Sequence, residues 1–437
     1  MALALALPVV IVLQVIFVFS LAAVRGQTDL AAVNDAVRVA FDRGVLATNQ
    51  VPKPWILRGG HQFTECVGLS VALDPQRDVW QAALATKMHS RMIDPCSELY
   101  RSVRGENTEL MDYSRYWHGY RLLLWPVLAH SDVLVLRVIT ALLVAGGVAL
   151  FFVGLRGTIG STPTIIIVAT MFLLTDLWHI WRIATHGLSM FVILGGAGAF
   201  ALLLRLSANQ YLWIVSAAAL GAVFNFVDFL INPPMMPMLL SFIVLAFVPQ
   251  FRRDGQRDGV RPLALAMTVA ASWFLGYAGT WGTKWVLAIW FSNNAMEEAA
   301  NIVNQVTFRL DGLEPGSTMF RVPLVPTISM ILKAFESVGA ILVVPIIAAV
   351  LIHVRDNHKS FDRAYFYQLT LPVSITLLWF ELLSNHTQLH PNFVYRSAST
   401  AIALVLAAGI ISSNAPVSAA SLWINLRRFV APAGVPA

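Results

Sequence analysis

Charged residues are scarce in this chain: Asp, Glu, Lys and Arg make up only 12% of its 437 residues. A soluble globular domain carries roughly 25%, so the scarcity excludes an ordinary soluble fold. The 30 Lys and Arg residues outnumber the 24 Asp and Glu residues, but they are spread over many short loops. Because nucleic-acid binding needs a concentrated basic face, that class of function is excluded as well.

Familiar catalytic signatures are also missing. The sequence has no Walker motif, Gly-x-Ser-x-Gly elbow, His-Glu-x-x-His zinc motif or dinucleotide fingerprint. His386 and His390 have a spacing compatible with a metal on a helix, but Pro391 interrupts the helix and no third ligand has a recognisable spacing. The sequence therefore requires no cofactor, and leaves open a divalent metal bound weakly by external carboxylates.

Long apolar runs make up most of what is present. Hydrophobic residues account for 57% of the chain, and its 13 Trp and 25 Phe residues fit aromatic belts at bilayer interfaces. A spanning helix needs about 20 mostly apolar residues. We expect about ten spans, at 5–24, 133–154, 163–180, 187–206, 210–229, 236–250, 263–281, 327–353, 365–383 and 397–413. The stretch 284–292 is too short to span and is predicted to be interfacial or re-entrant.

The predicted fold is an all-α integral membrane protein with one polytopic domain, 1–437. Its first span, 5–24, is expected to be an uncleaved signal anchor, although Met1–Ser20 also resembles a signal peptide. A long loop follows at 25–130, and the remaining spans occupy 131–437. Two helices are expected along the membrane surface in this loop, at Asp29–Phe41 and Arg115–Leu128.

Basic residues predict the orientation of the chain. They concentrate at 251–261, at 353–363 and at Arg427 and Arg428, and such clusters favour the cytoplasmic side. With ten spans and a cytoplasmic N-terminus, all three fall on that side. The loop 25–130 and most of the unusual polar groups then lie outside the cytoplasm. Cys66 and Cys96 both fall in this loop, where a disulfide is chemically allowed, with two separate buried thiols as the alternative.

The most informative polar cluster lies between the last two expected spans. It contains Glu381, Asn385, His386, His390 and Arg396. Ionisable groups at the end of a membrane span are costly unless they are solvated or have a task. The cluster therefore predicts a site that faces water or a substrate.

Three carboxylates compete for the role of general base. Glu65 precedes the apolar run 67–73, where it could deprotonate an acceptor hydroxyl or simply charge a helix N-terminus. Asp112 lies in the same loop, and Asp176 lies near the end of the expected span 163–180. Sequence alone does not choose among them.

Cationic and aromatic residues predict how an anionic substrate would be held. Lys284, beside Trp285, suits a phosphate group, and Arg396 could bind one through two nitrogens. Ordinary anchoring to lipid phosphates is the alternative for both. Trp117 and His118 have aromatic neighbours suited to stacking on a sugar ring or packing on lipid.

Four segments together carry a resemblance to a known class. They are Phe63-Thr-Glu-Cys66, Arg115-Tyr-Trp-His-Gly-Tyr120, Gly276–Trp285 and Ser384–Arg396. They resemble a family of bacterial polytopic membrane proteins, whose layout is similar to the GT-C class of membrane glycosyltransferases. The resemblance implies a polyprenyl-phosphate sugar donor and an acidic base in the first external loop, a place taken here by Glu65. Many GT-C enzymes have an Asp soon after the first span; here Asp29 and Asp35 are early but lie on an amphipathic segment.

The sequence thus favours a glycosyltransferase of the bacterial inner membrane with its active site outside the cytoplasm. Its expected partners are a polyprenyl-phosphate sugar, a glycan or lipid acceptor and the bilayer, with no nucleic acid. Two alternatives stay open. One is a transporter or flippase of a lipid-linked or anionic solute, although polar groups here gather at one surface rather than at the bilayer midplane. The other is a membrane transferase of acyl or phosphoglycerol groups.

Overall fold

The computed structural model describes residues 2–48, 62–76, 78–89, 94–175, 177–253, 262–311, 322–337 and 339–413. Within these ranges the chain is mostly helical, as predicted, and its elements are α1 (Ala2–Gln27), α2 (Leu30–Asp42), α3 (Gln62–Ala72), α4 (Val79–Leu84), β1 (Lys87–His89), α5 (Pro95–Val103), β2 (Leu110–Asp112), α6 (Arg121–His130), α7 (Val133–Ile159), α8 (Ser161–Leu174), α9 (Leu177–Ile180), α10 (Ala184–Leu206), α11 (Gln210–Val227), α12 (Met235–Arg253), α13 (Pro262–Phe291), α14 (Ala295–Asp311), α15 (Val325–Phe335), α16 (Gly339–Asp356), α17 (Arg363–Thr370), α18 (Val373–Leu382), α19 (Ser384–Leu389) and α20 (Pro391–Ile411).

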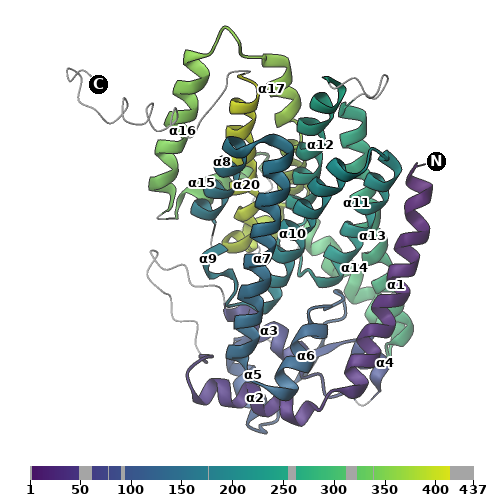
Figure 1. The fold of residues 1–437 in the computed structure, drawn as a ribbon. Coiled ribbons are helices and arrows are strands. Elements are labelled where there is room, and N and C mark those ends of the chain that lie inside the picture. Colours follow the sequence, from purple (N-terminus) through teal and green to yellow (C-terminus); the bar gives the residue numbers. More distant parts are fainter. Residues whose placement is uncertain are drawn as a thin grey trace.

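Apolar helices of membrane-spanning length dominate the architecture (Figure 1). Seven helices in the described ranges are long and apolar enough to cross a bilayer: α1, α7, α10, α11, α13, α16 and α20. Helices suit the bilayer interior because their backbone hydrogen bonds are made within the segment. The chain is therefore a multi-pass membrane protein.

The other expected spans correspond to shorter or interrupted helices. Segment 163–180 is divided between α8 and α9, 327–353 between α15 and α16, and 365–383 between α17 and α18. Pro372 stands at the last of these breaks, where its missing N–H cannot extend a helix. The number of crossings therefore stays a prediction.

Two local predictions are wrong. The stretch 284–292 is not a separate interfacial segment, because α13 continues unbroken to Phe291. Lys284 lies within α13 and does not end the helix. Its charge is tolerated there because the ammonium group donates to an acceptor inside the protein. The expected helix at Arg115–Leu128 begins only at Arg121, because His118 adopts a left-handed backbone with φ of 58° that a helix cannot contain.

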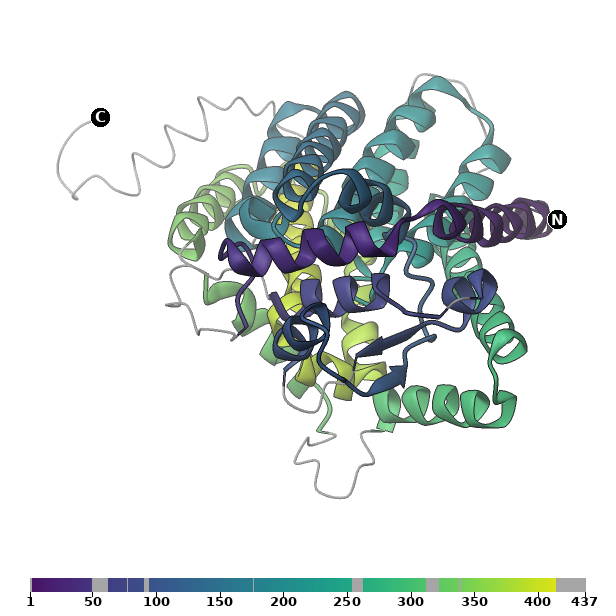
Figure 2. The ribbon, with the colours of Figure 1, turned by 90° about the horizontal axis from the view of Figure 1, so that it is seen from below.

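The elements between α1 and α7 form a small layer at one end of the molecule (Figure 1). The expected helix at Asp29–Phe41 is confirmed as α2, with the Asp29 carboxylate accepting from the N–H groups of Ala31 and Ala32. Figure 2 shows α2 running across this end of the helical bundle. The antiparallel pair β1–β2 adds a small sheet that the all-α prediction did not include.

A disulfide joins two helices in this layer. It connects Cys66 of α3 with Cys96 of α5, and both residues are fully buried. The sequence left this pairing open beside two separate thiols; in the structure the two cysteines are bonded to each other. The disulfide therefore ties α3 to the outer part of the layer.

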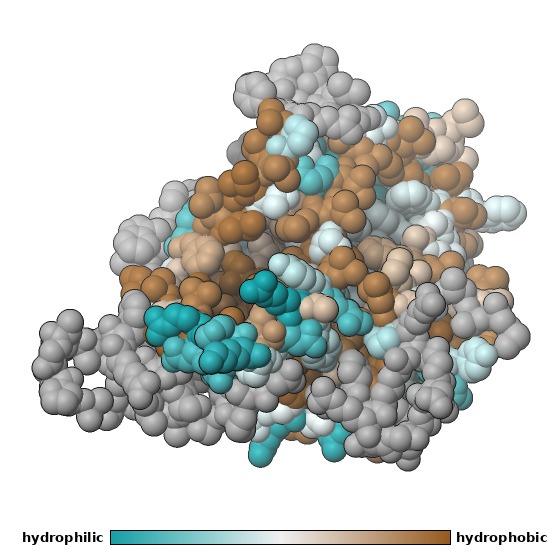
Figure 3. All heavy atoms as spheres, turned by 90° about the horizontal axis from the view of Figure 1, so that it is seen from above, coloured by the Kyte–Doolittle hydropathy of each residue, from teal (hydrophilic) through white to brown (hydrophobic). Residues whose placement is uncertain are grey.

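Glycines bring α7 and α10 into direct backbone contact. A Cβ atom on Gly154 would lie 2.4 Å from the carbonyl oxygen of Gly198, so neither position has room for a side chain. Small residues permit this close packing in membranes, where van der Waals contact replaces the hydrophobic effect between helices. Seen from the end at which α1 begins, hydrophobic residues cover much of the surface and hydrophilic residues gather in one area (Figure 3).

Candidate functional site

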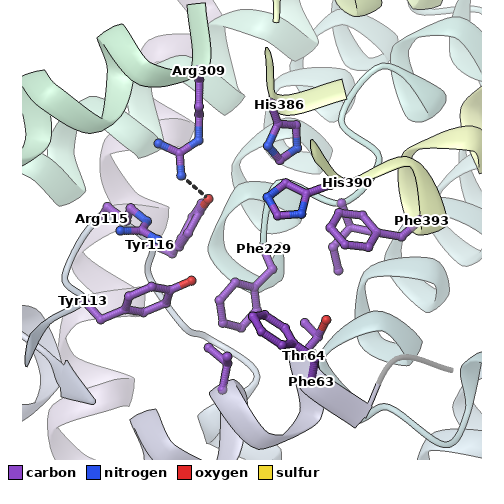
Figure 4. Close-up of a pocket in the computed structure, with 12 residues that line it drawn as sticks. Phe63, Thr64, Tyr113, Arg115, Tyr116, Phe229, Arg309, His386, His390 and Phe393 are labelled. Atoms are coloured by element: carbon purple, nitrogen blue, oxygen red, sulfur yellow. Dashed lines mark hydrogen bonds between the residues drawn. The ribbon is translucent and has the colours of Figure 1, made fainter. Parts of the chain in front are cut away.

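A pocket opens where the first-loop layer meets the bundle (Figure 4). Its cavity volume is about 70 Å³, and the pocket is partly open to the outside. Its walls come from segments far apart in the sequence: α3, the loop before α6, the connection from α11 to α12, α14, and the region of α19 and α20. The lining residues are Phe63, Thr64, Val67, Tyr113, Arg115, Tyr116, Phe229, Ile231, Arg309, His386, His390 and Phe393.

Arg309 reaches the pocket from the inner face of α14. The buried residues Glu298, Ile302 and Arg309 share one face of this amphipathic helix. The guanidinium group donates to the Tyr116 hydroxyl at 2.7 Å and to the Gln305 carbonyl at 2.8 Å. Its Nε is buried without an acceptor, and no carboxylate of the described residues lies within ion-pair distance.

Arg115 enters the pocket from the loop before α6. Its guanidinium carbon lies 4.2 Å from the centre of the Tyr113 ring, a cation–π contact. Trp281 and Trp285 both donate to its backbone carbonyl, at 2.9 and 3.3 Å. Like Arg309, Arg115 has a buried Nε without an acceptor and no carboxylate within ion-pair distance in the described chain. Two guanidinium groups that have no carboxylate partner among the described residues therefore meet one small pocket.

Two histidines complete the polar part of the lining. His386 donates from Nε2 to the carbonyl of Leu230 at 3.0 Å, and its ring centre lies 4.9 Å from that of His390. His390 stacks on Phe393 at 5.1 Å. Burial lowers the pKa of His386 well below its ordinary value, and the nearby His390, Arg309 and Arg115 act in the same direction. His386 is therefore neutral at pH 7.

Strained backbone supports two sides of this pocket. Leu230, whose carbonyl binds His386, has φ of 61°, and His118 has φ of 58°. A branched or bulky residue adopts this conformation only when its surroundings impose it. In the second turn, His118 donates from Nε2 to the Tyr113 carbonyl at 2.8 Å, and Gly119 packs directly against Phe226. Both strained turns thus hold residues that line the pocket.

Glu65, the predicted base, does not line the pocket, although its neighbour Thr64 does. Its carboxylate is 3% exposed and binds Arg137 of α7, with an Oε2 to Nη2 distance of 2.7 Å. Burial raises the pKa of Glu65, while the charge of Arg137 opposes that rise. In this arrangement Glu65 ties α3 to the bundle.

Lys284 and the residues near it are also held inside the protein. Its ammonium group is fully buried and donates to the backbone carbonyl of Leu84. Trp117 is buried beside it and donates from Nε1 to the carbonyl of Thr280. Trp285 holds the backbone of Arg115, as described above. None of these three side chains belongs to the pocket lining. They pack behind the residues that do.

The other predicted site residues are dispersed. Asn385 donates to the Phe308 carbonyl in α14 at 2.6 Å. Arg396 is buried, with Nη1 3.4 Å from Nδ1 of His186. Asp112 is half-exposed in β2 and lies 3.8 Å from the ammonium group of Lys87. Asp176 lies outside the described residues.

Sequence reasoning found His386 and His390 but missed both arginines as site residues. A signal for Arg309 was present in the sequence. Arg309 lies on the same face of the amphipathic segment 295–311 as Ile302, and this face points inward. Arg115 lies in an aromatic run that suggested a surface helix. Helical periodicity alone cannot reveal that a turn, rather than a helix, presents this side chain.

Comparisons with known proteins leave the family open. A scan against family models, a search of curated proteins and a search of solved structures found no match. Among the described residues, no group of three or more His, Cys, Asp or Glu side chains is placed to hold a metal ion. The chemistry of the pocket therefore rests on its own side chains.

Proposed function

We propose that this protein is a membrane glycosyltransferase whose pocket binds the phosphate of a polyprenyl-phosphate sugar. The supporting observation is that Arg115 and Arg309 meet at the pocket without a carboxylate partner in the described chain. Burying a guanidinium group without a counterion is costly. An anionic ligand that accepts from both groups would offset this cost, and phosphate oxygens suit guanidinium donors particularly well.

The rest of the lining suits the other parts of such a donor. Tyr113, Tyr116, Phe229 and Phe393 supply aromatic faces, on which a sugar ring can stack. The polyprenyl chain would leave the pocket along the apolar surface of the bundle. His386 and His390 offer nitrogen atoms for hydroxyl groups of donor or acceptor.

The proposed orientation places the pocket at the outer face of a bacterial inner membrane. The N-terminus and the basic connection between α16 and α17 lie at the opposite end from the layer of α2 to α6 (Figure 1). Basic residues favour the cytoplasmic side, so the N-terminus would be cytoplasmic. The disulfide between Cys66 and Cys96 is also consistent with an oxidising compartment on the side of the pocket.

In the proposed reaction, an acceptor hydroxyl oxygen attacks the anomeric carbon of the sugar. A new glycosidic bond forms, the bond from that carbon to the phosphate oxygen breaks, and the electron pair leaves with the polyprenyl phosphate. Arg115 and Arg309 stabilise the charge that develops on this leaving group. Electrostatic stabilisation by fixed donors is usually the largest single contribution to catalysis. The acceptor is a glycan or a lipid of the cell envelope, and its proton must pass to a base.

A transporter or flippase of a lipid-linked anion is the second candidate. One observation favours it: no carboxylate lines the pocket in the described chain, whereas the resemblance to GT-C enzymes implies an acidic base. Binding without turnover would be its signature.

Farnesyl phosphate, a short polyprenyl phosphate, tests the binding site directly. We expect Arg309→Ala to raise its Kd about 10- to 100-fold, the equivalent of one charge-assisted hydrogen bond. Arg309→Lys should retain part of the affinity, and farnesol should bind far more weakly than the phosphate. Arg101→Ala is the matched control, because Arg101 is an exposed arginine paired with Glu98 and Glu106. Unchanged affinity in Arg309→Ala, or equal binding of farnesol, would contradict the proposed site.

Turnover separates the two candidate functions. Radiolabelled polyprenyl-phosphate sugars are offered to the purified protein together with cell-envelope lipids and glycans. Transfer or release of sugar that is lost in Arg309→Ala supports the glycosyltransferase. Tight binding without turnover across a broad panel of donors supports the transporter.

A further inference from the structure

The pocket needs a proton acceptor, and its lining restricts the choice. This argument rests on the glycosyl transfer proposed above. No Asp or Glu lines the pocket in the described chain, and guanidinium and phenol groups act as hydrogen-bond donors rather than as bases. Histidine is the only remaining type of base, which leaves His386 and His390. We propose that His386 is the general base of the transfer and that its Nδ1 atom accepts the proton of the acceptor hydroxyl.

A backbone hydrogen bond fixes the tautomer of His386. Nε2 lies 3.0 Å from the carbonyl oxygen of Leu230, which can only accept. Nε2 therefore carries the hydrogen, and in the neutral ring Nδ1 holds the lone pair. The orientation of a base by a second hydrogen bond is the usual arrangement in enzymes that activate a hydroxyl group.

The conformation of Leu230 indicates that this hydrogen bond is imposed by the fold. Leu230 is fully buried and has φ of 61°, a backbone conformation that leucine rarely adopts. Its carbonyl is thereby directed at the imidazole. Strain of this kind concentrates at functional sites, where the surroundings hold a group in a required position.

The charges around His386 couple the base to the bound donor. The ionisable groups that face it are Arg309 from α14, Arg115 from the loop before α6 and His390 at the end of α19, with Tyr113 and Tyr116 in the same lining. The cationic groups among them oppose the protonation of His386 in the empty pocket. A bound phosphate would neutralise the arginines and so raise the pKa of His386. The base would then become stronger when the donor is present.

His390 is the competing base, and its packing favours a positioning role. Its ring stacks on Phe393 with ring centres 5.1 Å apart, and it meets the His386 ring at a tilt with centres 4.9 Å apart. Held in this way by Phe393, the His390 ring packs against the imidazole of His386 and restricts its orientation in the pocket. In the proposed step the acceptor proton moves to Nδ1 of His386, while the leaving phosphate keeps the electron pair of the broken bond; the proton later returns to solvent.

Two glutamine variants test the assignment. His386→Gln keeps an amide N–H that can donate to Leu230 but removes the base, and His390→Gln is the matched control. We expect His386→Gln to bind farnesyl phosphate within about threefold of wild type and to lose about 10²- to 10³-fold in kcat for sugar transfer. His390→Gln should lose far less. In wild type, the pKa that governs kcat should lie above the pKa that governs kcat/KM, because only the former reports the donor complex.

Each outcome has a distinct meaning. Retained kcat in His386→Gln, or a larger loss in His390→Gln, overturns the assignment of the base while leaving the transferase intact. If wild type binds farnesyl phosphate but transfers no sugar from any donor, the proposed function fails and the base with it. If His386→Gln is poorly folded, the two wild-type pH profiles decide: identical pKa values in kcat and kcat/KM would overturn the coupling of His386 to the donor.

Discussion

The ammonium group of Lys284 donates a hydrogen bond to the backbone carbonyl of Leu84, 200 residues earlier in the chain. Leu84 is the last residue of α4, and Arg121 donates to the preceding carbonyls of Ala82 and Ala83, each at 2.8 Å. Two buried cations thus satisfy the carbonyl end of one short helix. Cations are favourable there because the helix dipole leaves negative charge at that end.

Lys284→Met should therefore affect stability more than binding. The variant leaves the Leu84 carbonyl without its donor, which costs about 1–3 kcal/mol. We expect a lower Tm and a Kd for farnesyl phosphate within about threefold of wild type. A loss of affinity as large as that of Arg309→Ala would instead make Lys284 a phosphate ligand, as the sequence had suggested.

Glu65→Gln should destabilise the protein, because it leaves the Arg137 guanidinium partly buried without a counterion. Removing one partner of a buried ion pair costs about 3–5 kcal/mol. The double variant Glu65→Gln/Arg137→Gln should regain much of the lost Tm, since no unpaired charge is left. Turnover by this double variant then separates the two roles: a folded but inactive protein would restore Glu65 as the base.

Acid should destabilise the fold through His118. This side chain is fully buried, and burial lowers its pKa well below the ordinary 6.5, with Arg121 and Lys284 acting in the same direction. Below about pH 6.5 the unfolded chain binds a proton that the folded chain does not, so the contribution of neutral His118 is lost as the pH falls. His118→Asn tolerates the left-handed backbone and does not titrate. We expect its Tm to fall less than that of wild type between pH 7.5 and 5.5; parallel curves would contradict the assignment.

The Cys66–Cys96 disulfide should stabilise both the fold and the pocket. The two residues are 30 positions apart, and a bond closing a loop of this size typically contributes 2–4 kcal/mol. Cys66 shares α3 with Phe63, Thr64 and Val67, which line the pocket. The double variant Cys66→Ala/Cys96→Ala should therefore have a lower Tm and a weaker affinity for farnesyl phosphate. A lower Tm with unchanged affinity would show that the disulfide stabilises the layer without shaping the pocket.

The apolar helices could be predicted from sequence because hydrophobicity over about 20 residues is a local property. The helix at Asp29–Phe41 could be predicted as well, because its N-cap and the spacing of its apolar residues both depend on neighbouring residues. Lys284 was not, because its acceptor belongs to a segment 200 residues away. Arg115 and Arg309 were missed for the same reason: the absence of a carboxylate partner among the described residues is a property of the folded neighbourhood. His386 and His390 were found because both lie in one short polar stretch between apolar runs.

The contact between Gly154 and Gly198 has a consequence for the position of the pocket along the helical bundle. Neither helix can slide along the other without bringing a side chain into the space that the glycines leave empty, so α7 and α10 keep a single register. Arg137, which binds Glu65 of α3, belongs to α7 and lies about 25 Å along that helix from Gly154. The position of α3, which forms one wall of the pocket, is thereby linked through Arg137 to two glycines near the opposite end of α7.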